Sequence, residues 1–179
     1  MNPMMKIALC LLMLFTSSAV LAQKATDRSQ VRLRGRGRTL VLTSGSVRRT
    51  LDVKKQVSVA RLDEVKLLFQ TRRGSFNYLL VDACGPSKAV PDAKRCGAAD
   101  ECSLLWIKLD AAWKVSDIKG VPYLSCWQPI SSSDYKISGR TVEWEYDDFG
   151  EKKHYKFSYD ADEPERGFQM TESTVSLLN

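Results

Sequence analysis

Apolar and polar side chains alternate along the C-terminal third of the chain. Within residues 141–146, Val142, Trp144 and Tyr146 alternate with polar residues, and residues 155–159 repeat the pattern. A period of two is typical of a β-strand with one buried face. Turn-forming residues at 147–151 separate the two runs. The sequence therefore predicts a β-hairpin over residues 141–159.

Comparable apolar runs recur upstream, and most of them flank a short turn segment. The runs cover residues 38–43, 47–53, 65–71, 75–84, 103–109, 113–118 and 123–127. With the hairpin they make about nine short strands, which predicts an all-β fold: a single antiparallel β-sandwich, a barrel or a propeller-like meander. Residues 58–68 are the one stretch whose pattern also fits a helix.

The N-terminus has the pattern of an export signal. Lys6 precedes an apolar run over residues 7–15, and Val20-Leu21-Ala22 follows it. The run is shorter than the about 20 residues that span a bilayer. We expect residues 1–22 to be a cleavable signal peptide. Residues 23–179 should form a single β-rich globular domain without a transmembrane segment, and residues 23–30 could be a flexible start.

The exported part of the chain has four cysteines: Cys84, Cys96, Cys102 and Cys126. Four cysteines in an exported protein indicate two disulfides, and spacing alone allows three connectivities. Zinc is the competing interpretation, but no two cysteines are close together and the chain has one His. Antiparallel pairing of residues 75–84 with 103–109 would bring Cys84 opposite Cys102. We therefore favour Cys84–Cys102 and Cys96–Cys126, which would hold the loop of residues 85–101.

Charge is distributed unevenly between the two parts of the chain. Residues 23–75 hold fourteen Lys or Arg against four Asp or Glu, whereas residues 76–179 hold twelve against seventeen. The basic part contains four arginines at alternate positions: Arg32, Arg34, Arg36 and Arg38. In a strand all four would emerge from one face. The planar guanidinium group suits phosphate, sulfate or carboxylate, so the expected partner is an acidic protein or an anionic glycan.

The same four arginines also fit roles that involve no partner. They could belong to a flexible basic arm, or to a strand edge whose charge discourages aggregation. They could also lie beside the acidic segment 141–179, which holds ten acidic and four basic residues. We do not expect nucleic acid as a partner, because no aromatic residue lies between Gln23 and Leu68 to stack on bases.

The sequence offers little catalytic, metal-binding or cofactor chemistry. His154 is the only His and should make a cross-strand contact within the hairpin. Gly35 and Gly37 lack the third glycine of a dinucleotide loop, and the segment from Asp160 lacks the glycine and closing Glu of a calcium loop. We expect no cofactor and no metal. Asp82 is the one acid within an apolar strand, where a carboxylate needs polar partners.

Three functions are compatible with these observations. The favoured interpretation is a small exported binding module of unknown ligand that recognises or inhibits an acidic partner. We expect it in a bacterial periplasm rather than outside the cell, because the exported part has no Asn-x-Ser/Thr acceptor. The first alternative is an envelope hydrolase that uses carboxylates such as Asp82 or Asp162. The second is a structural accessory attached to an envelope assembly through a sheet edge.

Overall fold

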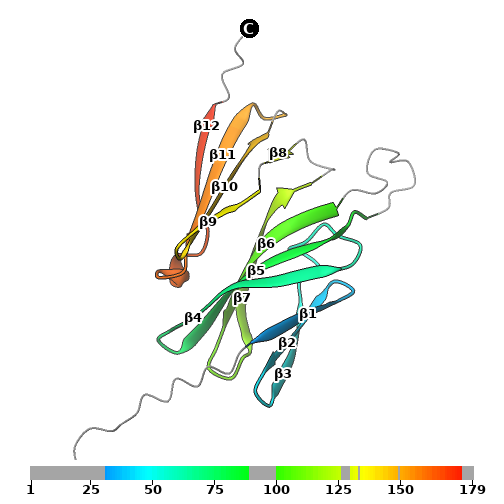
Figure 1. The fold of residues 1–179 in the computed structure, drawn as a ribbon, viewed down its shortest axis with the longest axis vertical. Helices are drawn as coiled ribbons and strands as arrows, with labels where there is room; N and C mark the ends of the chain where they lie inside the picture. The colour runs from blue at the N-terminus through cyan, green and yellow to red at the C-terminus, as the bar shows by residue number, and fades with distance from the viewer. Residues whose placement is uncertain (1–30, 89–99, 126–129, 133, 149, 175–179) are drawn as a thin grey trace, which may run out of the picture.

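A computed structural model describes residues 31–88, 100–125, 130–132, 134–148 and 150–174. These residues form three antiparallel β-sheets, and Figure 1 shows them arranged as layers. The N-terminal sheet has the order β1 (Arg32–Arg36), β2 (Thr39–Ser44), β3 (Val47–Asp52). The central sheet has the order β4 (Glu64–Arg73), β5 (Phe76–Pro86), β6 (Asp100–Leu109), β7 (Val115–Leu124).

The C-terminal sheet is built on a long hairpin of β10 (Thr141–Asp148) and β11 (Lys153–Asp160). Two short strands, β8 (Ile130–Ser132) and β9 (Lys136–Ser138), pair with β10. On the other side, β12 (Gln169–Thr174) pairs with β11 after the 3-10 helix η2 (Pro164–Arg166). The hairpin predicted from the alternating pattern is confirmed, with Trp144 opposite Phe157.

The central sheet is buried on both faces. Leu79 and Val81 of β5 pack in one apolar cluster with Leu40 and Leu42 of the N-terminal sheet. The alternate residues of the central sheet pack in a second cluster with Val142, Trp144, Phe157 and Tyr159 of the C-terminal sheet. A strand buried on both faces is apolar at successive positions, which explains the unbroken apolar runs of β5 and β6. Each fully buried aliphatic side chain contributes about 1.5–3 kcal/mol.

Residues 53–63 link the N-terminal sheet to the central sheet. The backbone of this linking segment lies against glycines of β1, β5 and β7. A Cβ at Gly85 would lie 1.9 Å from the carbonyl oxygen of Arg61, and a Cβ at Gly120 would lie 2.5 Å from that of Gln56. The linking backbone can come this close because glycine has no side chain. Gly35 has the same role beside Leu62, so its place in the sequence reflects packing and not a phosphate loop.

The helix considered for residues 58–68 is wrong. Val59 makes an isolated bridge with Ser87, and β4 begins at Glu64. Val57, Val59 and Leu62 of this stretch enter the same apolar cluster as the N-terminal sheet. The extended backbone follows from its contacts with the neighbouring strands, which a local helical pattern does not report.

The all-β prediction is confirmed, but the set of expected strands needs correction. The strands expected over residues 113–118 and 123–127 are one strand in the described residues, β7, which continues to Leu124. The structure also contains β8, β9 and β12, which the apolar pattern missed. Every residue of β9 and β12 is exposed, so neither strand alternates buried with exposed positions.

Cys84 and Cys102 lie opposite each other on β5 and β6 and form a disulfide, as the strand pairing predicted. Cys96 and Cys126 lie outside the described residues, and so do the expected signal peptide (residues 1–22) and residues 23–30. Within the described part of the chain, no helix has the length and apolar character needed to cross a membrane.

Candidate functional site

Three of the four predicted arginines share one exposed face. β1 is a strand, so Arg32, Arg34 and Arg36 emerge on the same side of the N-terminal sheet, and all three are exposed. This is the outer side, because the apolar residues of β2 and β3 pack inward against the central sheet. Alternate residues on a strand are about 6.6 Å apart, which sets the spacing of the three side chains at their base.

Arg38 does not belong to this row. β1 ends at Arg36, and Arg38 lies in the turn that leads to β2, where Gly37 has a φ of 59°. Arg38 is also partly buried. The expectation that all four arginines share a strand face is therefore wrong for Arg38, because a glycine with positive φ turns the chain before that position.

β3 adds a fourth arginine to the face. Arg32 is opposite Thr43 on β2, and Thr43 is opposite Arg48 on β3, so these three residues form a row across the sheet. Arg48 is exposed. We call Arg32, Arg34, Arg36 and Arg48 the arginine face. Sequence reasoning missed Arg48, because the alternating pattern stops at β1 and strand pairing alone brings β3 into line.

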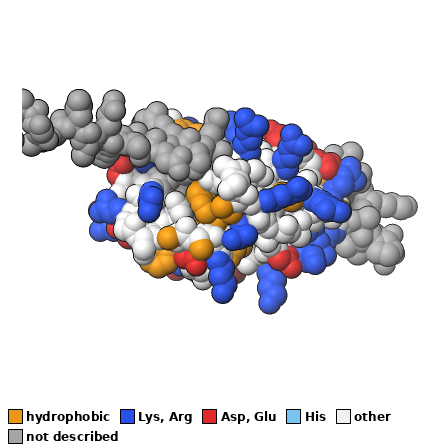
Figure 2. Space-filling view, turned by 90° about the horizontal axis from the view of Figure 1, so that it is seen from below, with side chains coloured by type: hydrophobic (Ala, Val, Ile, Leu, Met, Phe, Trp, Pro, Cys, Tyr) orange, Lys and Arg blue, Asp and Glu red, His pale blue; other side chains and the backbone are white. Residues whose placement is uncertain are grey.

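None of the four side chains of the arginine face makes an ion pair or hydrogen bond with another described residue. The idea that these arginines neutralise the acidic hairpin is wrong. β10 and β11 belong to the C-terminal sheet, on the opposite side of the central sheet (Figure 1). Figure 2 shows the molecule from below, where Lys and Arg side chains are more numerous than Asp and Glu.

Asp82 lies in a second feature, a hollow of about 400 Å³ lined by Glu64, Lys66, Asp82, Cys84, Tyr123, Asp134 and Tyr135. The Asp82 side chain is buried and accepts two hydrogen bonds. Tyr123 donates its hydroxyl to Oδ1 at 2.8 Å, and Tyr135 donates to Oδ2 at 2.9 Å. The sequence predicted that this carboxylate needs partners, and the structure supplies two phenols.

Burial and the neighbouring carboxylate keep these phenols protonated. Burial is the main cause that raises the pKa of Tyr123 above its usual value, followed by the hydrogen bond to Asp82. The pKa of Tyr135 is raised by burial and then by the charge of Asp82. The Sγ atom of Cys84 lies 3.5 Å from the Tyr123 hydroxyl. Both oxygens of Asp82 already accept hydrogen bonds. The contacts of Asp82 with Tyr123 and Tyr135 therefore connect β5 to β7 and to the segment before β9.

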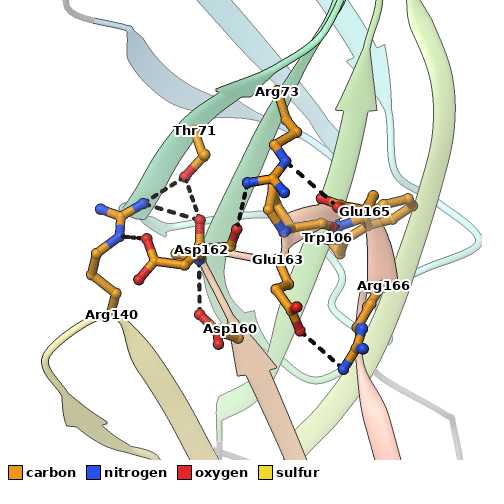
Figure 3. Close-up of polar contacts among 11 residues, drawn as sticks. Thr71, Arg73, Trp106, Arg140, Asp160, Asp162, Glu163, Glu165 and Arg166 are labelled. Atoms are coloured by element: carbon orange, nitrogen blue, oxygen red, sulfur yellow. Dashed lines mark hydrogen bonds and ion pairs between the residues drawn. The ribbon is translucent and has the colours of Figure 1, made fainter.

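Asp162, the other carboxylate considered for hydrolysis, belongs to a polar network between two sheets (Figure 3). Arg140 donates to Asp162 Oδ1 at 2.5 Å, and to Thr71 Oγ1 of β4 at 2.9 Å. Arg73 donates to the backbone carbonyl of Asp162 at 3.2 Å. Asp162 is thus engaged in joining the C-terminal sheet to β4. Nothing in the sequence pattern indicated this network, because its contacts with β4 join residues 69 and 89 positions apart.

His154 makes the expected cross-strand contact. Its Nδ1 atom lies 2.8 Å from Asp147 Oδ1 on β10, and its Nε2 atom lies 3.8 Å from Glu145 Oε2. The register places His154 directly opposite Asp147. The imidazole therefore bridges two acids on the hairpin and has no nucleophile beside it among these contacts.

Comparison of the chain with protein-family models, curated proteins and solved structures finds no match in any of the three. Functional reasoning therefore depends on the residues of this chain. Of its features, the arginine face has exposed charges without partners among the described residues, whereas the charges of Asp82 and Asp162 are already paired or hydrogen-bonded.

Proposed function

We propose that this chain is an exported binding module that recognises an anionic partner, an acidic protein or an anionic glycan, through its arginine face. The observation that carries the proposal is the row of Arg32, Arg34 and Arg36, exposed on one side of β1 and without acidic partners among the described residues. Each guanidinium offers a planar fork of donors that fits carboxylate or sulfate oxygens.

The arrangement of the face supports a binding role over a solubility role. Arg48 lies two strands away from Arg32, about 9.6 Å at the usual strand spacing, so the charges cover an area and not only a line. Like charges gathered on one surface create a positive potential that attracts anions. Asp52 is the acid on this side of β3, and Lys54 lies 3.7 Å from its carboxylate.

The arginines of β1 also discourage strand pairing at this edge of the sheet, a role that is compatible with binding. The backbone N–H of Leu62 donates to the carbonyl oxygen of Gly37 at 2.6 Å, and Gly35 is in close contact with Leu62. The linking segment therefore packs against the inner face of β1, on the side opposite the arginine side chains.

Export to the periplasm is part of the same proposal. The signal-like N-terminus and the disulfide between Cys84 and Cys102 support a compartment in which disulfides persist. Fractionation of the source cells, with N-terminal sequencing of the recovered protein, tests it. We expect a chain that begins near Gln23 in the periplasmic fraction. A full-length chain in the cytoplasmic fraction would contradict export.

Salt-dependent retention on an immobilised sulfated glycan tests the arginine face. We expect the oxidised protein to bind at low salt, and the triple variant R32S/R34S/R36S to elute at clearly lower salt, because screening weakens exposed charge contacts. The matched control is R72S/K114S/K152S, which removes three exposed charges from other parts of the surface. If both triple variants shift elution equally, binding reflects net charge alone and the proposal fails.

The hydrolase alternative lacks a comparable observation. Asp82 is buried beneath two phenol donors, and Asp162 is bound by Arg140. A catalytic carboxylate must reach the proton it transfers. In the described residues, both candidate acids instead use their oxygens in contacts that hold the layers together.

A further inference from the structure

β12 is an outer strand of the C-terminal sheet and differs from the other edge strands. It pairs with β11 on one side, and all six of its residues are exposed. It is six residues long, contains no proline, and pairs with β11 without a register shift. An exposed, regular edge presents unpaired backbone donors and acceptors to another strand.

The other edges of the described sheets have features that hinder strand pairing. β1 and β3 are rich in arginine, and β4 has Lys66, two arginines and a bulge. β7 contains Pro122 and register shifts near both ends. β8 and β9 have three residues each. Charges, proline, bulges and short length are the usual protections of sheet edges, and β12 lacks most of them.

The charge of β12 is also locally balanced. Glu172 is its only charged residue, and Lys153 of β11 donates to Glu172 Oε2 at 3.2 Å. In a chain with a formal net charge of +6, this edge is therefore nearly neutral. Two copies can approach each other here with less repulsion than at the arginine face.

We propose that β12 pairs antiparallel with β12 of a second copy and forms a continuous sheet across a two-fold axis. An isologous antiparallel pair places one residue opposite itself. Of the central positions, Thr171 fits best: it puts threonine opposite threonine, which is a favourable cross-strand pair. Centring on Glu172 would instead put like charges opposite each other.

The register centred on Thr171 determines the remaining contacts. Met170 faces Glu172 of the second copy, and Gln169 faces Ser173 of the second copy. Met170 is 54% exposed in the single chain, so pairing would cover part of an exposed apolar side chain. The short paired segment of each strand buries less than the about 1,200 Å² that a stable interface requires. The dimer is therefore reversible and depends on concentration.

This geometry has a consequence for binding that rests on the proposed function. A two-fold axis normal to the C-terminal sheet leaves the central and N-terminal sheets of both copies on the same side. Both arginine faces then point in the same direction. Such a dimer engages an extended anionic polymer or surface at two places, which strengthens binding without a new contact.

Light scattering after size-exclusion chromatography, over a series of concentrations, tests the dimer. We expect the mass to rise from one chain towards two. The variant Thr171→Glu should weaken the dimer at least about tenfold, because the new carboxylates face each other across the axis. Within one chain the new acid lies opposite Lys156, so the fold is retained. The control Thr50→Glu makes the same charge change on exposed β3 and should leave the dimer unchanged.

A cross-linking variant tests the register. Thr171→Cys brings two thiols to positions with Cα atoms about 4.5–5.5 Å apart, within disulfide reach. We expect a dimer of this variant on a non-reducing gel, whereas Thr50→Cys should not form one. A mass of one chain at every concentration, or no cross-link in the Thr171→Cys variant, would overturn the proposal. Retention on the glycan is measured separately, so loss of the dimer and loss of anion binding are distinguishable outcomes.

Discussion

The carbonyl oxygen of Arg61 lies 1.9 Å from the position that a Cβ at Gly85 would occupy. The segment that links the N-terminal and central sheets therefore rests directly on the backbone of β5. Next to this contact, the N–H of Asp63 donates to the carbonyl oxygen of Cys84 at 3.0 Å. Packing of the linking segment thus requires glycine at position 85, next to the disulfide-bonded Cys84.

Replacement of Gly85 by alanine should destabilise the fold, because backbone cannot yield as a flexible side chain can. We expect a loss of about 2–4 kcal/mol in the free energy of unfolding, measured by urea denaturation. The control is Gly45→Ala, at an open turn position with a φ of 56°, which should cost about 1 kcal/mol through backbone strain alone. Equal losses in the two variants would refute the close-contact explanation.

Burial of Tyr123 and Tyr135, together with their contacts with Asp82, predicts loss of stability in alkali. The folded state raises the pKa of Tyr123 and Tyr135 above the ordinary value of 10.0, so both phenols keep their protons after the unfolded chain has lost them. Their stabilising contribution is therefore complete below pH 10 and decreases above it. Each phenol contributes a slope of up to about 1.4 kcal/mol per pH unit.

Urea denaturation between neutral and strongly alkaline pH measures this slope. The variant Tyr123→Phe should show a shallower decline above pH 10, together with a lower free energy of unfolding at neutral pH, because Asp82 loses one donor. Tyr155→Phe is the comparison: its hydroxyl donates to the exposed Glu151 at 2.7 Å and this contact also raises its pKa, so the slope should change less than in Tyr123→Phe. An identical alkaline slope in the wild type and Tyr123→Phe would contradict the assignment.

The Cys84–Cys102 disulfide should stabilise the fold chiefly by restricting the unfolded chain. Its cysteines are 18 residues apart, which corresponds to about 3 kcal/mol in the loop-entropy estimate. The double variant C84S/C102S should lose about this amount in urea denaturation. Non-reducing peptide mapping of the wild type checks the pairing and shows how Cys96 and Cys126 are linked. A peptide joining Cys84 to another cysteine would contradict the structure.

Arg140 should stabilise the contact between the C-terminal sheet and β4 through the shape of its guanidinium group. Arg140→Met removes the donors to Thr71 and Asp162 and should cost about 1–2 kcal/mol in the free energy of unfolding. Arg140→Lys should recover little, because one ammonium cannot reproduce the planar fork. The control is Arg166→Met, whose partner Glu163 is exposed and local, with an expected loss below about 1 kcal/mol. Full recovery by lysine would show that charge alone suffices.

The positions of strands were predictable where at least one face of the strand is buried. The alternation of Val142, Trp144 and Tyr146 reports an apolar core on one side and water on the other, and the hairpin follows from it. The Cys84–Cys102 pair was predictable for a related reason, since antiparallel pairing of β5 and β6 brings the ends of the two strands together. β12 was missed because both of its faces are exposed.

The sequence by itself determined the alternation of arginines along β1, because side chains of a strand alternate between its faces. Only the tertiary structure decided that Arg38 leaves this face, that Arg48 joins it, and that the acidic hairpin is too distant to neutralise it. It also gave Asp82 its two phenol partners, from residues 41 and 53 positions away. Local periodicity reports which face of a strand is buried, but the partner of each polar group depends on how the sheets pack.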